Sequence, residues 1–116
     1  MADNSLTIAA SGLHAANKRI SVSAHNSANV TTKKFKKQQV LDEELPGGGV
    51  KSRVRTVDTA GVPEKDPVTG EQTEGSNVNI AEEQVDRINA SAAAKMNANV
   101  IRTSDDMLGT IVNIKK

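Results

Sequence analysis

Apolar side chains recur at helical spacing at both ends of this 116-residue chain, and the stretch between the two ends has a different pattern. Steps of three and four residues predict one helix over residues 6–28 and another over residues 80–114. The middle is rich in β-branched residues, glycine and proline, which favour strands and turns. We therefore predict an α+β fold, mainly α, in which two long terminal helices pack as a coiled-coil-like pair with a small β-hairpin and loop region between them. The two apolar series are Leu6, Ala9, Leu13, Ala16 and Ile20, and Ala81, Val85, Ile88, Ala92, Met96, Val100, Thr103, Met107, Ile111 and Ile114.

One aromatic residue and a low hydrophobic content limit the core that the chain can build alone. Phe35 is the only aromatic, and hydrophobic residues make up 36% of the sequence. Because aromatic side chains bury the most area per residue, a core of aliphatic residues must gain its stability from helix-on-helix contact. We expect a single domain, with an N-terminal helix and motif at 1–34, a hairpin and loop at 35–78 and a C-terminal helix at 79–116. The helices would pack on each other and on other copies.

The net charge of +1 hides an asymmetry between the two halves of the chain. Residues 1–57 contain nine Lys or Arg and four Asp or Glu, whereas residues 58–116 contain six and ten. Opposite halves would attract when subunits pack end to end or side by side, although an exposed ion pair contributes only about 0–1 kcal/mol. Ordinary solvated faces are an equally good interpretation.

Several kinds of chemistry and targeting are not indicated. The chain has no cysteine, so it has neither disulfides nor thiolate chemistry. Residues 1–5 contain no basic segment, and no apolar run is long enough for a signal peptide or a membrane span. If the protein leaves the cytoplasm, we expect a route that needs no cleaved signal peptide.

The first helix is predicted to start near Asn4 or Ser5, either of which can cap it, and to run to about Ala28. Its leucine and isoleucine residues are seven apart with alanines between them, which indicates a seam with small residues at alternate positions. Gly12 interrupts an otherwise good helix at a cost of about 1 kcal/mol relative to alanine. A close backbone contact at Gly12 would explain its use.

The middle of the chain predicts a hairpin followed by a loop. Gln39, Leu41 and Glu43 alternate with Val40 and Asp42, a β-branched run follows at 50–57, and Pro-Gly-Gly-Gly at 46–49 separates them. Because a lone hairpin is marginal in water, it should pack on the helices or on a neighbouring subunit. Residues 58–78 contain glycine and proline among acidic and polar residues, and we expect an extended loop that orders only in an assembly.

The second helix has a clear start. Asn79 as N-cap and Glu82 three residues later form the pattern of a capping box, while Lys115 and Lys116 would favour the C-terminal end. The apolar series from Ala81 to Ile114 advances by about 3.67 residues per step, the period of a straight or slightly right-handed helix pair rather than a left-handed zipper. A helix of roughly 50 Å exceeds the roughly 35 Å of the first helix. Its remainder must meet another surface.

Catalytic and metal sites are not indicated. His14 and His25 would lie roughly 16 Å apart along the helix axis, too far to share a metal ion. The adjacent carboxylates Asp105-Asp106 and Glu82-Glu83 point in different directions on a helix, so we expect solvent-facing or intersubunit charges there. The glycines at 47–49 lack the lysine and helix of a phosphate-binding loop. We expect no enzymatic activity, cofactor, metal or small-molecule substrate.

The lysines around Phe35 form the best candidate for a nucleic-acid or membrane contact, because clustered positive charge releases counterions from phosphates. They are Lys33, Lys34, Lys36 and Lys37. One aromatic residue is a poor stacking platform, and the chain is not basic overall. A solvated face or intersubunit salt bridges are the favoured interpretation.

Two motifs make the chain resemble a known family. Ile8-Ala9-Ala10-Ser11-Gly12-Leu13-His14-Ala15, Arg19-Ile20 and Asn26-Ser27-Ala28-Asn29-Val30-Thr31-Thr32-Lys33-Lys34-Phe35 are similar to the N-terminal signature of the bacterial flagellar rod, hook and distal-rod proteins. Gly75-Ser76-Asn77-Val78-Asn79, Glu82-Glu83, Asn97-Ala98-Asn99-Val100-Ile101 and Asp106-Met107-Leu108 resemble the C-terminal motif of that family. The short middle region is most like that of the proximal-rod proteins of the FlgC type. Lys34 stands where the family usually has glycine, and Met96 where it usually has tyrosine.

The resemblance implies a structural subunit of the flagellar basal-body rod in the periplasm, exported by the flagellar type III apparatus without a cleaved signal peptide. Its partners would be other rod proteins, copies of itself and the export apparatus, and not nucleic acid. Its terminal helices would pack in a tube that transmits torque, and the middle region would project outward. The implied assembly interface comprises Leu6, Ala9, Gly12, Leu13, Ala16, Ile20, Asn26, Asn29, Val85, Ile88, Ala92, Met96, Val100, Met107 and Ile111.

Two other classes stay open at this point. A soluble helical-hairpin adaptor would fold stably alone and melt cooperatively. A nucleic-acid-binding module would depend on the lysines at 33–37 and would bind with a steep salt dependence.

Overall fold

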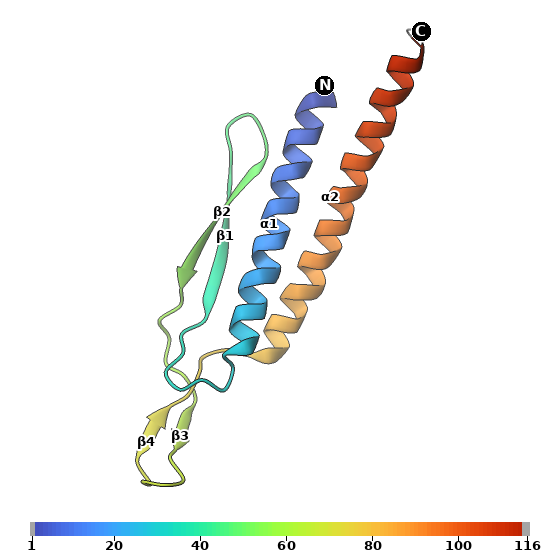
Figure 1. Ribbon diagram of the computed structural model, residues 1–116. Helices are drawn as coiled ribbons and strands as arrows, with labels where there is room; N and C mark the ends of the chain where they lie inside the picture. Colours follow the sequence, from blue (N-terminus) through green and yellow to red (C-terminus); the bar gives the residue numbers. More distant parts are fainter. Residues whose placement is uncertain (1, 115–116) are drawn as a thin grey trace.

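The computed structural model describes residues 2–114 and the side chains of residues 4–113. Two antiparallel helices lie side by side, one hairpin lies along the first helix, and a second hairpin projects beyond one end of the pair (Figure 1). The molecule is a rod with extents of 78 × 24 × 15 Å. This is the α+β, mainly helical fold that the sequence predicts. The elements are α1 (Ala2–Ala28), β1 (Gln38–Glu44), β2 (Val50–Thr56), β3 (Pro63–Lys65), β4 (Gln72–Glu74) and α2 (Ile80–Ile114).

Two contacts fix the register of the helix pair. Near one end, the Asn26 amide donates a hydrogen bond to the Glu83 carboxylate at 3.0 Å. Further along, Gly12 lies against Asn97. The two contacts are separated by 14 residues in each helix, from residue 26 to 12 in α1 and from residue 83 to 97 in α2. The pair therefore advances by two heptads between these contacts, as a left-handed coiled coil does.

The face of α2 that meets α1 differs from the predicted one. Among helices and strands, α2 packs on α1 alone within residues 2–114. Eight of its buried or half-buried positions follow one another in steps of four and three, which is a heptad spacing rather than the predicted spacing of about 3.67, and the half-buried Ser91 and Ala93 lie beside this series. The prediction was wrong because it followed the larger apolar side chains, whereas small and polar ones line the contact. These positions are Glu83, Arg87, Ala90, Ala94, Asn97, Ile101, Ser104 and Leu108.

Both helix starts differ in detail from the prediction. The first helix begins at Ala2, so Asn4 and Ser5 lie inside it and do not cap it. The Asn79 side chain accepts hydrogen bonds from the N–H groups of Ala81 and Glu82 at 3.0 and 3.4 Å, which confirms the N-cap. The second hydrogen bond of a capping box, from the Asn79 N–H to the Glu82 carboxylate, is not formed among the described residues. The Glu82 carboxylate instead lies 3.5 Å from the Lys37 ammonium group. Lys115 and Lys116 lie outside the described residues.

The first hairpin is confirmed, and it packs on α1. Its strands pair antiparallel from Gln38 opposite Thr56 to Glu44 opposite Val50. The three glycines of the turn all have positive φ, a conformation that side chains rarely adopt. Ser11 fastens the turn to α1, because its hydroxyl accepts a bond from the Val50 N–H at 3.1 Å.

An ion pair joins the first hairpin to α1 further along. The Arg19 guanidinium donates two hydrogen bonds to one carboxylate oxygen of Asp42, at 2.6 and 3.1 Å. Burial raises the pKa of Asp42, but the bonds from Arg19 and Ser52 and the Arg19 charge outweigh it and hold the pKa below its ordinary value.

Residues 58–78 are not the extended loop that the sequence predicts. Strands β3 and β4 pair antiparallel from Pro63 opposite Glu74 to Lys65 opposite Gln72. Side chains from other segments hold the base of this hairpin. The Asn77 amide donates to the carbonyl oxygens of Val57 and Thr59, and its oxygen accepts the Lys37 N–H at 2.7 Å. Composition missed the hairpin because these partners are distant in the sequence.

Lys34 begins this junction in a left-handed conformation, with φ of 61°. This backbone conformation costs roughly 1–2 kcal/mol for a residue with a side chain, whereas glycine adopts it freely. The family that the N-terminal motif resembles usually has glycine here, and the geometry gives the physical reason. The Lys34 N–H donates to the Glu74 carbonyl oxygen at 2.9 Å, so this turn ties the end of α1 to β4.

We predict that replacing Gly12 with alanine lowers stability, and that trimming Asn97 restores it. An added Cβ would come within 2.7 Å of the Asn97 amide oxygen, so the Asn97 side chain must shift and give up its bond to the Ala93 carbonyl oxygen. Set against the gain of about 1 kcal/mol that alanine brings in helix propensity, Gly12→Ala should have a small net cost of about 1 kcal/mol or less. Asn97→Ala should be nearly neutral alone and should recover most of the loss in the double variant. Urea unfolding followed by circular dichroism measures all three. Equal losses in Gly12→Ala and the double variant would contradict this packing.

We predict that the junction at β4 responds to acid through Glu74. Hydrogen bonds from Lys36 and from the Gly61 N–H hold the pKa of Glu74 below its ordinary value. A lowered folded-state pKa gives stability that is present above the unfolded pKa of roughly 4.3 and is lost as pH falls through the folded pKa. The amide shift of Gly61 in an NMR titration should therefore change with a midpoint below about 4.3. The step should vanish in Glu74→Gln; a midpoint at or above the ordinary value would refute the pairing.

Candidate assembly interface

The contacts inside the chain bury small and polar side chains and leave the large apolar ones outside. Among the described side chains, four alanines and one valine form the buried apolar core. Twelve large hydrophobic side chains are exposed, and eight of these lie on α2. Since apolar surface is stabilised by leaving water, this distribution is typical of a protein whose core is completed by a partner. The buried apolar residues are Ala9, Ala15, Ala16, Val40 and Ala90.

A buried polar cluster fixes how the three segments meet. The Asn26 amide donates to the Gln38 carbonyl oxygen at 2.8 Å and to the Glu83 carboxylate, and its oxygen accepts the Gln38 N–H at 2.9 Å. The Ser23 hydroxyl donates to the Glu83 carbonyl oxygen at 2.9 Å. Glu83 is 5% exposed, so the expectation of a solvent-facing carboxylate was wrong for this residue. Buried polar groups with mutual partners specify one geometry, because any other arrangement leaves them unpaired.

We predict that Asn26→Ala destabilises the chain by about 2–3 kcal/mol, because it leaves the Gln38 backbone and the buried Glu83 carboxylate without this partner. Asn29→Ala is the matched control. Asn29 bonds only to its own helix end, through the His25 carbonyl and the Thr32 hydroxyl, so its loss should cost under about 1 kcal/mol. Thermal melts of the two variants compare them. Similar melting temperatures would show that the cluster does not fix the packing.

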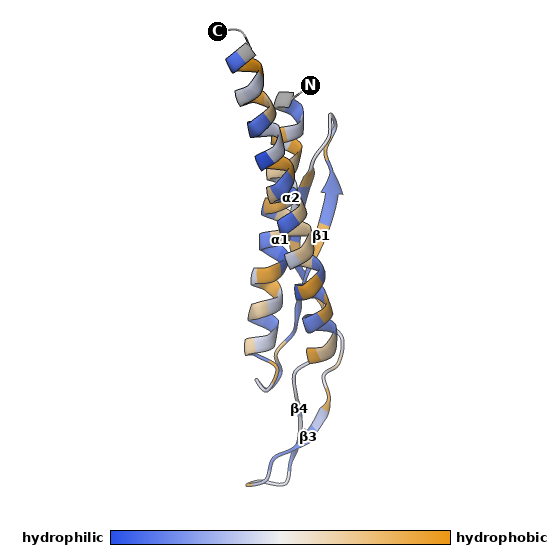
Figure 2. Cartoon of the chain, turned by 90° about the vertical axis from the view of Figure 1, so that its right-hand side faces the viewer, coloured by the Kyte–Doolittle hydropathy of each residue, from blue (hydrophilic) through white to orange (hydrophobic). Residues whose placement is uncertain are grey.

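The apolar series predicted on α2 forms a continuous exposed face. We name it the α2 outer stripe. The exposed fractions of Ile88 and Met96 are 66% and 69%, and those of Val100 and Ile111 are 45% and 49%. Hydrophobic segments recur along α2 between hydrophilic ones (Figure 2). The stripe consists of Val85, Ile88, Ala92, Met96, Val100, Thr103, Met107 and Ile111, all exposed.

The stripe continues past the reach of α1. In the register set by Asn26 and Gly12, the first residue of α1 lies near residue 107 of α2. The last turns of α2 therefore extend beyond α1, as Figure 1 shows. There Met107 and Ile111 line a shallow apolar groove of about 330 Å³ on α2 itself. This confirms the expectation that the second helix is too long for its mate.

The structure separates the predicted interface residues into three groups. Ala9, Gly12, Ala16 and Asn26 meet α2 or β1 of the same chain, so their contacts are internal. Leu6, Leu13 and Ile20 are half-buried, and Asn29 closes the end of α1. The members on α2 are exposed and free to meet a partner; they are Val85, Ile88, Ala92, Met96, Val100, Met107 and Ile111.

Sequence reasoning missed the internal face of α2. Ser23, Glu83 and Asn97 make its decisive contacts, and none of them is apolar. The signal that could have found this face is the heptad spacing of small and polar residues from 83 to 108. The stronger apolar series beside it masked that signal.

The lysine run at 33–37 faces carboxylates of the same chain. Lys33 lies 3.8 Å from Asp66, Lys36 pairs with Glu74, and Lys37 lies 3.5 Å from Glu82. Three of its four charges thus hold α1 to the second hairpin and to α2. Because these lysines are paired, little positive charge remains for a phosphate backbone. The lysines form salt bridges, as expected, but within one chain rather than between subunits.

The rest of the described chain gives no sign of other chemistry. Within residues 2–114 no three His, Cys, Asp or Glu side chains gather closely enough to hold a metal ion. His25 packs edge-on against Phe35, with ring centroids 5.5 Å apart. Neither helix combines the length and apolar character needed to cross a membrane.

A helical rod that keeps its large apolar side chains on one outer face has the features of a structural protein that assembles through its helices. Comparison with known families agrees. Residues 71–114 match the family model of the flagellar basal body rod FlgEFG protein C-terminal. This segment runs from the end of the second hairpin through α2, so it contains the whole outer stripe. No curated protein matches the chain.

The match indicates a structural role in the basal-body rod of the bacterial flagellum. The family consists of structural flagellar proteins and is not known for enzymatic activity. It also implies a location in the basal body and assembly with other rod components.

Proposed function

We propose that this chain is a structural subunit of the proximal part of the flagellar rod, assembling helically with copies of itself and with other rod proteins to transmit torque across the periplasm. The observation that carries the proposal is the α2 outer stripe, because the matched segment leaves its apolar face uncovered. An exposed apolar face of this length is costly in water unless a partner covers it.

The assignment to the proximal rod is supported by the compact middle region. Residues 35–78 form only two short hairpins, as expected for proteins of the FlgC type rather than for longer distal-rod or hook proteins. Export through the flagellar type III apparatus, without a cleaved signal peptide, completes the proposal.

Helical growth follows from the shape of the stripe. It lies on one helix and faces away from α1, so another subunit must cover it, and we infer that the covering surface is unlike the stripe itself. Contacts between unlike surfaces do not close into a dimer and instead extend into rings or helical assemblies. The half-buried Leu6, Leu13 and Ile20 on α1 are the surface in this chain best suited to receive the stripe.

The test is a pair of substitutions on the stripe. Ile88→Asp with Met96→Asp should leave the circular dichroism spectrum and the melting temperature nearly unchanged, because both side chains are mostly exposed. In cells that lack the native gene, this variant should be expressed, should be absent from purified basal bodies and should fail to restore swimming.

The matched control places the same charges on an exposed part of α2 beside the stripe, with Gln84→Asp and Ala98→Asp. It should swim normally. Normal swimming of Ile88→Asp with Met96→Asp would reject the stripe as the assembly surface. If the chain instead melts cooperatively alone and never enters basal bodies, the adaptor interpretation replaces the rod role.

A further inference from the structure

A groove with a basic rim lies between α1 and the first hairpin. It has a volume of about 420 Å³, and Leu45, Val50 and Ala15 contribute apolar side chains to it. Leu45 is 41% exposed and open to a further contact. His14, Lys18 and Lys51 also line the groove; all three are exposed, and no ion pair involves them in the described residues.

The tip of the second hairpin has the opposite character. Val68 is 90% exposed at its turn, the most exposed of the large apolar side chains. Alternation along β3 places Glu64 and Lys65 on opposite faces, and Asp66 follows directly after the strand. Extending the register of Lys65 opposite Gln72 sets Glu71 across from Asp66. Asp66 is paired with Lys33, whereas Glu64 and Glu71 are in no ion pair among the residues described.

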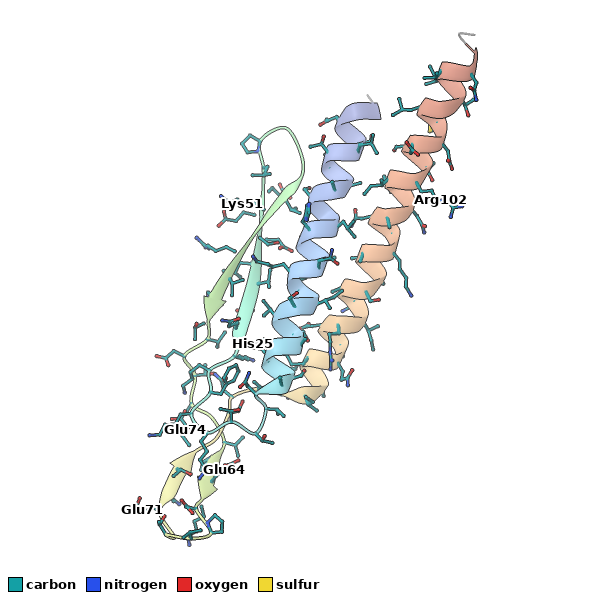
Figure 3. The ribbon with its side chains drawn as sticks, viewed as in Figure 1. His25, Lys51, Glu64, Glu71, Glu74 and Arg102 are labelled. Carbon is teal, nitrogen blue, oxygen red and sulfur yellow. The ribbon has the colours of Figure 1, made fainter. Side chains whose placement is uncertain are left out.

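These two surfaces lie at different heights along the long axis of the rod and cannot meet within one chain. Lys51 lies on the first hairpin beside the helices, while Glu64 and Glu71 lie on the hairpin that projects beyond the opposite end (Figure 3). The junction around Asn77 and Glu74 ties this second hairpin to the helices. A second copy shifted along the long axis could bring its tip to the groove of the first.

We propose that the β3–β4 tip of one copy docks into the groove between α1 and the β1–β2 hairpin of a second copy, with Val68 entering the groove beside Leu45 and with Glu64 and Glu71 facing Lys18 and Lys51. The surfaces match in charge and in apolar character. The contact joins unlike surfaces, so it repeats head to tail along the axis and leaves the α2 outer stripe free for lateral neighbours. The inference rests on the proposed function for its setting, but purified chain suffices to test it.

The absence of native cysteine makes disulfide trapping a clean test. A tagged chain with Val68→Cys is mixed with an untagged chain with Leu45→Cys, oxidised with copper phenanthroline and run on a non-reducing gel. We expect a mixed dimer several-fold more abundant than with Asn99→Cys, an exposed position on α2, as the untagged partner. Equal trapping at both positions, or stronger trapping on α2, would overturn the proposal.

Charge reversal supplies a second test that misfolding cannot imitate. Lys18→Glu with Lys51→Glu in the Leu45→Cys chain should reduce the mixed dimer to the level of the Asn99→Cys control. Glu64→Lys with Glu71→Lys in the Val68→Cys chain should restore it, because the pairs are then opposite again. Circular dichroism checks the fold of each variant. Failure of rescue between two folded variants would count against the contact.

The outcomes are independent of the proposed function. If disulfide trapping fails while the stripe variant abolishes swimming, the head-to-tail contact is refuted and the rod role stands. If trapping and rescue succeed while the stripe variant swims, the contact is supported and the stripe is not the assembly surface.

Discussion

The close antiparallel approach of α1 and α2 is the contact on which the rest of the structure depends. It is made mainly by alanine, glycine, serine and asparagine, with Ile101 and Leu108 half-buried beside them, and Gly12 against Asn97 shows how little space is left. Small side chains bury little area, so this contact alone gives modest stability. What it gives instead is precision, because the buried Asn26 and Glu83 are satisfied only in one register.

The use of mainly small and polar residues inside the chain explains why its outer surface is apolar. Since the internal face of α2 uses small and polar residues, its large aliphatic side chains remain on the outer stripe. A self-sufficient monomer would place them the other way round. A chain that completes its core only among neighbours fits an assembling rod subunit, in keeping with the family match over residues 71–114.

The two hairpins depend on the helix pair in different ways. The first is held along α1 by Ser11 and by the pair of Arg19 with Asp42. The second is held at its base, where Asn77, Lys36 and Glu74 join three segments distant in sequence, and by the ion pair of Lys33 with Asp66 nearer its turn. Val68 at its tip is 90% exposed.

The sequence by itself determined the helices, the first hairpin, the N-cap at Asn79 and the need for a close contact at Gly12, because these follow from periodicity, turn chemistry and glycine, all of which are local. It also carried motifs that resemble those of the rod family, and the family match covers the C-terminal one over residues 71–114. Only the tertiary structure decided which face of α2 meets α1, that Glu83 is buried and that residues 58–78 contain a hairpin. Those outcomes depend on partners far apart along the chain. An apolar stripe has the same sequence pattern whether it packs on a helix of the same subunit or of another.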